Sequence, residues 1–459
     1  MKHFAWQWLV ISSVLAGSLA AETRPQYGGT LHVATRSALT TLDPADRTQP
    51  DSLAGRTVTT LLYDTLVTSD DSGRIKPGLA DTWQASNHNQ RWQFHLRRGV
   101  KFHDGTPLSA EIAANSLHFA NPSWSVSAQA DVLVVEDSGD PELLAELALP
   151  RNAIVKRNAE SRNADNKVTG TGPFRVADWQ PGKKLTLAAN EDAWRGRPFL
   201  DAIEIEMGKN AHDQMTALDL GKEELVEVAP GQAHRVSQEH YTLLRSEPIV
   251  LLALAFSREA ASADAQTRRE ALSLCVDRAS IGSVLLQGAG QPAAGILPTW
   301  ISGYGFVFPV ATDLPKARQL RAQVHSAPAW TLGYDANDSL ARLIAERIAL
   351  NARDVGLTLQ PASSAAADLR LVEIPLASSD PWIALLEVIQ LAGLPAAKSK
   401  STSVEDLYAA EQAALAGKRL IPLFHLPVSY AASRNLKHLS IRADGSVDLA
   451  GSWLEAAKP

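Results

Sequence analysis

The stretch WQFHLRRGVKFHDGTPLSAEIAANS, residues 92–116, decides how the first part of this chain is interpreted. Apolar and polar residues alternate from Trp92 to Leu96, and this period of two is typical of a strand with one buried face. The Asp-Gly pair at 104–105 predicts a tight turn, because glycine adopts positive φ angles without steric cost. Ser109 directly precedes an alanine-rich stretch and is well placed to cap a helix. The stretch therefore predicts a strand, a turn and a capped helix.

The whole chain has 459 residues, 45% of them hydrophobic, so it should bury sizeable cores and divide into two or more domains. Its net charge is −6 and it has no basic block, which argues against nucleic-acid binding. Residues 249–256 (IVLLALAF) and 421–430 (IPLFHLPVSY) are apolar and extended, as in strands buried on both faces. Strand patterns dominate before Glu247 and helix patterns after it. The chain is predicted to be a mixed α/β protein.

The N-terminal residues 1–21 predict a signal peptide. A lysine at position 2 precedes a short apolar stretch, and small residues near Ala20-Ala21 suit cleavage. The apolar stretch is shorter than the roughly 18–20 residues that cross a bilayer, although a short membrane anchor is the alternative. The single cysteine, Cys275, lies far from the cleavage site, so we expect no lipid attachment there. These features predict a periplasmic location.

Motifs that could suggest chemistry are better explained as structure. His103 has no second histidine at ligand spacing, so we expect no metal site. The Gly-Thr-Gly-Pro motif at 170–173 precedes a strand, which favours a turn over a phosphate loop. Cys275 lies in the apolar segment ALSLCV, where a buried inert thiol is expected. No nucleophile elbow and no H-E-x-x-H motif is present. We therefore predict neither catalytic residues nor a cofactor.

Several sequence blocks occur in an order that resembles the extracellular solute-binding protein family 5, the receptors of dipeptide, oligopeptide and nickel ABC importers. The blocks are Gly28-Gly29-Thr30-Leu31, Leu42-Asp43-Pro44, and residues 62–67, 77–83, 92–116, 170–174, 190–198, 264–278 and 288–298.

The resemblance implies a two-lobed periplasmic-binding-protein-like fold of class II, cluster C type, with an additional small subdomain in the first lobe. The implied parts are a first lobe from residues 22–45, 168–250 and 426–459, the subdomain from 46–167, and a second lobe from 251–425. It also implies a monomeric receptor, not an enzyme, that delivers its ligand to the permease subunits of an ABC transporter.

A ligand site is expected in the cleft between the lobes, where closure excludes water and strengthens a few polar contacts. The candidate ligand-binding residues are Thr40, Thr41, Trp300, Tyr304, Asp380 and Trp382. Each aromatic candidate is equally compatible with a packing role. In the family's peptide receptors an aspartate before the Asp-Pro pair holds the peptide amine. Here that position falls on Ala377, so only Asp380 could hold the amine.

Peptides are the first predicted substrate class. A non-peptide solute such as an oligosaccharide, haem or metal chelate is an alternative, because an unpartnered buried ammonium would be costly. An alternative of another class is a periplasmic hydrolase with the same fold, since a triad assembled in space cannot be recognised from sequence.

Overall fold

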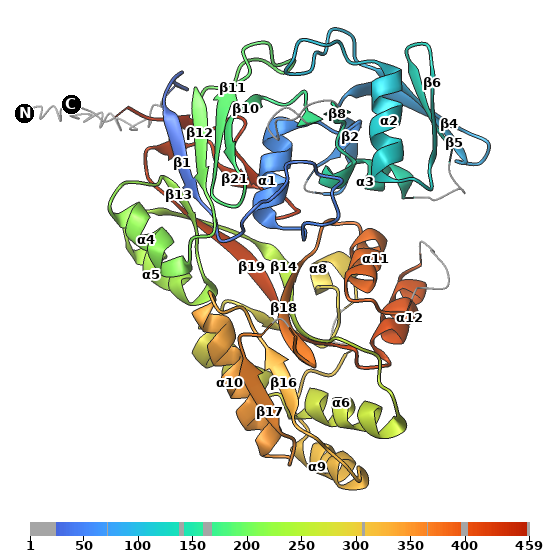
Figure 1. The fold of residues 1–459 in the computed structure, drawn as a ribbon, viewed down its shortest axis with the longest axis vertical. Coiled ribbons are helices and arrows are strands. Elements are labelled where there is room, and N and C mark those ends of the chain that lie inside the picture. The colour runs from blue at the N-terminus through green and yellow to red at the C-terminus, as the bar shows by residue number, and fades with distance from the viewer. Residues whose placement is uncertain are drawn as a thin grey trace, which may run out of the picture.

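The computed structural model describes residues 24–70, 72–136, 142–158, 168–304, 308–364, 366–395 and 403–456. The predicted signal peptide, residues 1–21, lies outside the described residues. Two lobes follow one another along the long axis of the molecule, and β14 and β19 run between them (Figure 1).

One large sheet extends through both lobes. Its strand order is β10-β11-β12-β1-β13-β19-β14-β18-β16-β17, and β15 pairs with β19. The strands are β10 (Phe174–Gln180), β11 (Lys184–Ala189), β12 (Ala202–Glu206), β1 (Thr30–Ala34), β13 (Leu225–Glu227), β19 (Leu420–Ala432), β14 (Thr242–Phe256), β18 (Leu369–Pro375), β16 (Trp330–Gly333), β17 (Leu359–Ala362) and β15 (Gln291–Pro292).

The antiparallel pair β14 and β19 joins the lobes. One end of β19 pairs with β13, and the far end of β14 pairs with β18, so the same two strands belong to both lobes. Every residue of β19 is buried. The apolar stretches at 249–256 and 421–430 are thus strands buried on both faces, as their composition predicted.

The first lobe contains the strands β10 to β13 with α1 (Leu53–Leu62), α4 (Ala211–Asp219) and α5 (Ala233–Gln238). Its strands β12, β1 and β13 are parallel neighbours. Ser52 caps α1 by accepting a hydrogen bond from the backbone N–H of Gly55. The C-terminal segment returns to this lobe as the short pairs β20 (Leu436–Lys437) with β23 (Trp453–Leu454), and β21 (Ser440–Ile441) with β22 (Val447–Asp448).

A subdomain with its own hydrophobic core is attached to the first lobe. Its sheet has the order β4-β5-β7-β6, formed by β4 (Ala80–Ser86), β5 (Arg91–Leu96), β7 (Val132–Glu136) and β6 (Ser125–Gln129). Helices α2 (Ala110–Ala120) and α3 (Leu143–Leu147) and the turn η1 (Pro150–Asn152) complete it, and the short pairs β2 (Val67–Ser69) with β3 (Ile75–Pro77), and β8 (Lys156–Arg157) with β9 (Val168–Thr169), border it. The predicted strand, turn and helix are confirmed: Phe94 is fully buried, Gly105 has φ 82°, and Ser109 caps α2.

The second lobe packs helices around β18, β16 and β17 (Figure 1). They are α6 (Ala263–Cys275), α7 (Arg278–Ser280), α8 (Thr299–Ser302), α9 (Leu314–Gln323), α10 (Ser339–Arg353), α11 (Pro381–Leu391) and α12 (Val404–Leu415), with a π-helical turn η4 (Ile281–Leu285). Cys275 is fully buried at the end of α6, and burial raises the pKa of its thiol to about 12. The predicted buried thiol is therefore confirmed.

The Gly-Thr-Gly-Pro motif at 170–173 fits against the end of α1. A Cβ atom on Gly170 would lie 1.9 Å from the carbonyl oxygen of Leu62, and one on Gly172 would lie 2.5 Å from that of Leu61. The motif also joins the subdomain to the lobe, because the backbone N–H of His103 donates to the Gly170 carbonyl at 2.9 Å. These glycines allow close packing of backbones, which agrees with a structural role.

Arg56, on α1, forms hydrogen bonds with several separate segments of the chain. Its side chain is 2% exposed and its guanidinium donates to the Asp51 carboxylate and to the carbonyls of Pro375, Leu376 and Asp444. All of its N–H groups are used. Arg56 therefore ties the first lobe to the end of β18 and to the C-terminal segment.

We expect Gly170→Ala to lower the free energy of unfolding by more than about 2 kcal/mol, because the added methyl overlaps backbone atoms that cannot move aside. Gly417→Ala is the control, since its nearest new neighbour is 4.0 Å away. Chemical denaturation measures both. Equal stability of the two variants would contradict the close approach.

We expect Arg56→Met to cost about 3 kcal/mol of unfolding free energy, because carbonyls that Arg56 satisfies lose their donors. Arg74→Met is the control, since the Arg74 side chain is 79% exposed and pairs with Asp70 within one turn. A loss for Arg56→Met no larger than for the control would show that the buried hydrogen bonds are dispensable.

Candidate ligand-binding cleft

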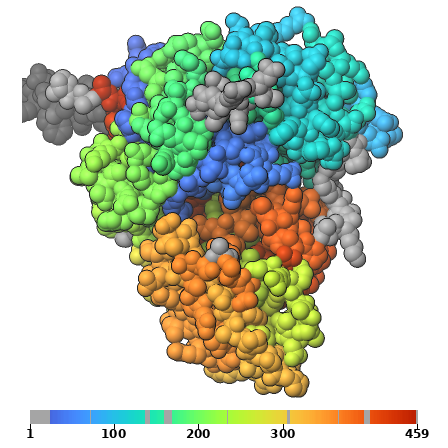
Figure 2. Space-filling model, viewed as in Figure 1, coloured from blue at the N-terminus to red at the C-terminus, as the bar shows by residue number. Residues whose placement is uncertain are grey.

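The topology directs the carboxyl ends of parallel strands from both lobes toward the same space. In the first lobe, Arg36 follows β1 and Glu227 ends β13. In the second lobe, Asp338 follows β16 and Glu373 lies near the end of β18, and these two strands are also parallel. Ligands of open α/β sheets bind beyond the carboxyl ends of the strands. A narrow groove separates the lobes at this level (Figure 2).

Arg36 is the cation around which charged groups of the two lobes meet. Its Nε and backbone N–H donate to Glu227 Oε2 at 3.0 and 3.2 Å within the first lobe. Its guanidinium nitrogens lie 3.8 Å from carboxylate oxygens of Asp338 and Glu373 in the second lobe. Burial alone would lower the pKa of Arg36, but Glu373 and Glu227 outweigh it and raise the pKa above its ordinary value. Arg36 is therefore a permanent cation facing more than one carboxylate.

A second contact between lobes lies at the subdomain. Arg151 of η1 forms an ion pair with Glu387 of α11, and its Nε is buried without an acceptor among the described residues. Burial lowers the pKa of the Arg151 guanidinium; the carboxylates of Glu146 and Asp51 oppose this effect, and the like charges of Arg47 and Arg56 add to it. Charged groups of both signs therefore surround Arg151 on the first-lobe side of the cleft.

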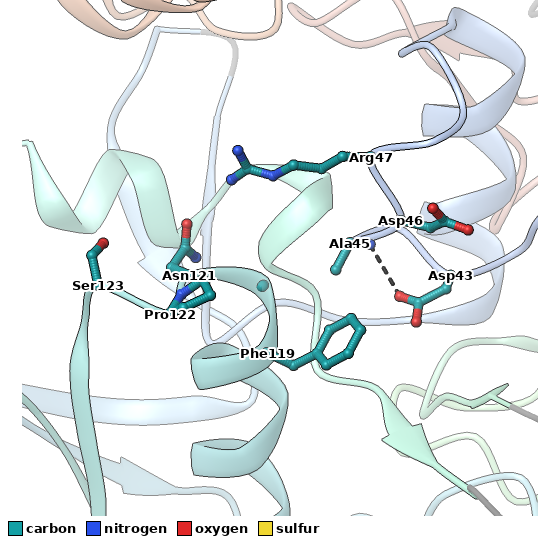
Figure 3. Close-up of a pocket in the computed structure, with 9 residues that line it drawn as sticks. Asp43, Ala45, Asp46, Arg47, Phe119, Asn121, Pro122 and Ser123 are labelled. Atoms are coloured by element: carbon teal, nitrogen blue, oxygen red, sulfur yellow. Dashed lines mark hydrogen bonds between the residues drawn. The ribbon is translucent and has the colours of Figure 1, made fainter.

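A cavity of about 830 Å³ lies between the loop at 43–47 and the end of α2 (Figure 3). Arg47 extends across it toward Asn121, and the exposed ring of Phe119 lies on its other side. The floor is fixed by Asp43, which accepts hydrogen bonds from Arg157 at 2.7 and 2.8 Å and from the Ala45 N–H at 3.0 Å. The cavity is lined by Asp43, Ala45, Asp46, Arg47, Phe119, Ala120, Asn121, Pro122 and Ser123.

The first-lobe candidates Thr40 and Thr41 lie in the loop after β1. The Thr40 N–H and hydroxyl donate to Gln49 Oε1 at 2.5 and 3.2 Å, and the Thr41 hydroxyl accepts from the Asp43 N–H at 3.2 Å. These contacts shape the loop that carries Arg47. A direct contact of either threonine with a ligand stays a prediction.

The second-lobe candidates Trp300, Tyr304 and Trp382 belong to one hydrophobic cluster. Trp300 Nε1 donates to the Pro248 carbonyl at 2.8 Å, the Tyr304 hydroxyl donates to the buried carboxylate of Glu411, and Trp382 is 3% exposed. Their polar atoms therefore serve the packing of the second lobe. Trp300 and Tyr304 remain partly exposed and stay predicted ligand contacts, whereas Trp382 presents almost no surface.

Asp380 begins α11. Its Oδ1 accepts hydrogen bonds from the backbone N–H groups of Trp382 and Ile383, both at 3.0 Å, so it is the N-cap of this helix. The structure thus gives Asp380 a local role that the sequence analysis did not foresee. Its predicted role as partner of a ligand amine stays a prediction.

Sequence reasoning missed Arg36, Arg151, Glu373 and Glu387. None of them lies in a motif, and each meets its partner only through the placement of the lobes. Arg151 follows a proline at the start of a short turn, and that position is its single local signal.

The imidazole of His103 lies against the main chain of the Gly-Thr-Gly-Pro motif. Its Nε2 lies 3.1 Å from the Gly172 carbonyl oxygen, and burial lowers the pKa of its imidazole to about 4. No group of three or more His, Cys, Asp or Glu side chains in the described part of the chain is arranged to hold a metal ion.

Within the same residues, none of the helices has the length and hydropathy that a membrane span requires.

Solved structures share this fold across almost the whole chain. The structure of NikA from Staphylococcus aureus in complex with Ni(L-His)2 matches with a TM-score of 0.79 at 17% identity, covering 92% of this chain and 99% of that one. The structure of the oligopeptide-binding protein AppA from Bacillus subtilis in complex with a nonapeptide matches with a TM-score of 0.79 at 19% identity, covering 94% and 100%. The predicted two-lobed periplasmic-binding-protein fold is therefore confirmed.

Curated relatives match over shorter spans. The nickel-binding protein NikA of Staphylococcus aureus is 26% identical over 242 residues, 50% of this chain and 49% of its own length. The heme-binding protein A of Haemophilus influenzae is 27% identical over 294 residues, 54% of this chain and 53% of its own. The chain thus spans about half the length of these relatives.

The family model described as "Bacterial extracellular solute-binding proteins, family 5 Middle" matches residues 74–372, which contain most of the subdomain and most of the second lobe. This chain therefore belongs to family 5 of the bacterial extracellular solute-binding proteins.

Proposed function

We propose that this chain is an exported periplasmic receptor that captures a peptide between its lobes and delivers it to the permease subunits of an ABC transporter. The observation that carries the proposal is the meeting of charged side chains from both lobes in one groove, where Arg36 faces Asp338 and Glu373. Family membership supports a receptor over an enzyme. The predicted signal peptide supports export.

Capture would proceed by closure of the lobes about the shared strands β14 and β19. Closure removes water from the groove, so a few polar contacts to the solute gain strength. A solute shifts the equilibrium toward the closed state only by as much as it binds that state more tightly. Affinity therefore depends on the solute groups that contact both lobes at once in the closed state.

The cleft offers charged groups of both signs. Arg36 faces the carboxylates of Asp338 and Glu373, and Arg151 is paired with Glu387. A peptide carries an ammonium and a carboxylate, so it has a partner of opposite sign for each kind of group. The solved structure of AppA with a nonapeptide shows that the fold accommodates a peptide.

A non-peptide solute is the second candidate, and the local structure of Asp380 favours it. Because Asp380 caps α11, the residue expected to hold a peptide amine already has backbone partners. Relatives of the same fold were solved with Ni(L-His)2 and with agropinic acid.

Native mass spectrometry of protein purified without denaturation tests the choice of solute. We expect a solute that stays bound during purification and that fragments as a peptide. We also expect calorimetry to show one short peptide bound per chain. A retained solute with no peptide fragments would favour the second candidate. Turnover of peptides or esters beyond one equivalent would contradict a receptor and indicate a hydrolase.

Substitutions at Asp380 separate amine binding from helix capping. We expect Asp380→Asn to weaken binding of an amine-bearing peptide by roughly 2–5 kcal/mol, because the charge partner is lost. Its stability should stay within a few tenths of a kcal/mol, since asparagine caps helices equally well. Asp380→Ala should additionally lose about 1 kcal/mol of unfolding free energy. Unchanged calorimetric affinity of Asp380→Asn would leave Asp380 as a cap alone.

A further inference from the structure

Arginines of the first lobe and its subdomain reach acceptors of the second lobe at separate places along the cleft. Arg56 donates to the carbonyls of Pro375 and Leu376. Arg36 faces the carboxylates of Asp338 and Glu373, and Arg151 pairs with Glu387. In each case the cation comes from one lobe and the acceptor from the other.

These contacts differ in how easily water can replace them. The Arg56 acceptors lie beside the joining strands, because the Leu376 N–H donates to the Ile249 carbonyl of β14 at 2.8 Å. The Arg56 side chain is 2% exposed, so water has little access to this contact. The side chains of Arg36 and Arg151 are 39% and 35% exposed, so solvent can take over their hydrogen bonds.

The two exposed contacts differ in the partners of the arginine. Arg36 stands 3.8 Å from both of its second-lobe partners, beyond hydrogen-bond range, and is bonded to Glu227 of its own lobe. Arg151 is in direct contact with Glu387, whose side chain is 16% exposed. Glu387 belongs to α11, which lies to the side of the joining strands (Figure 1).

We propose that Arg151 and Glu387 form an electrostatic latch, assisted by Arg36 with Asp338 and Glu373, that holds the lobes closed before any solute binds. Arg56 is the fixed contact near the hinge, and the latch is the releasable contact at the cleft edge. The inference rests on the proposed function, because it describes the resting state from which a solute would be captured.

The latch makes closure depend on salt. An ion pair at a protein surface changes an equilibrium constant, here the closed-to-open ratio, by about threefold. The factors of several such pairs multiply. At 0.5 M salt, surface charges are screened within a few ångströms, so the exposed pairs lose most of their effect. The closed-to-open ratio of the solute-free protein should therefore fall by about three- to tenfold between 0.05 and 0.5 M NaCl.

Single-molecule energy transfer measures the latch directly. Donor and acceptor dyes are placed on Asp131→Cys in the subdomain and His325→Cys in the second lobe, whose native side chains are 84% and 94% exposed. The native Cys275 is fully buried and does not compete for the dyes. The full chain is unfolded and refolded beforehand to remove any retained solute.

Arg151→Gln and Glu387→Gln should each shift the solute-free molecules toward the open state and abolish most of the salt dependence. The double exchange Arg151→Glu with Glu387→Arg should restore closure, which a purely structural role would not predict. Glu373→Gln should produce a smaller shift in the same direction. The matched control is Glu346→Gln, which breaks a pair with Arg342 within α10 and should leave the distribution unchanged.

An Arg151→Gln protein as closed as the wild type would overturn the latch, and so would an exchanged pair that stays open or a control that opens equally. If Arg151→Gln does not fold, as judged by circular dichroism, Glu387→Gln decides the matter alone. Because the measurement uses no solute, its failure is distinguishable from failure of the receptor function, which the search for bound peptides tests separately.

Discussion

The pairing of β14 with β19 is the constraint on which the rest of the structure depends. It runs from Thr242 opposite Ala432 to Ala255 opposite Leu420, and it connects the strands of both lobes into one sheet. The ladder is irregular around Pro248, which lies opposite Pro427, and register shifts flank that point. Proline has no N–H to donate, so hydrogen bonding is interrupted there. The backbone hydrogen bonding between the lobes is therefore least regular at this pair of prolines.

Much of the fold could be predicted because its signals are local. The apolar runs that became β14 and β19, the cap at Ser109 and the buried Cys275 depend on neighbours within a few residues. The cleft could not be predicted in the same way. Arg36 and Glu373, like Arg151 and Glu387, are far apart in the sequence, and ordinary surface residues of this type give no periodic or spacing signal before the lobes are placed.

The predicted ligand residues illustrate the same limit. Aromatic residues after a proline or glycine loop were expected to face the cleft, and the structure shows that internal hydrogen bonds use the polar atoms of Trp300 and Tyr304. Glu411 explains this arrangement: its buried carboxylate accepts from the Tyr304 hydroxyl and from the backbone N–H groups of Ile296 and Leu297. A buried carboxylate needs such donors, so the loop around residues 296–304 is held to α12. No local sequence pattern around residues 296–304 predicts a partner as distant along the chain as Glu411.

The loop around residues 296–304 is also connected to the irregular point of the β14–β19 ladder. Trp300 donates to the carbonyl of Pro248, the residue at which the β14–β19 ladder is interrupted. On the opposite strand, the Val428 N–H donates to the Ser246 hydroxyl, so side chains replace the missing backbone bonds at this point. The predicted ligand loop is thus joined to the irregular point of the β14–β19 ladder by a single hydrogen bond, without any intervening residue.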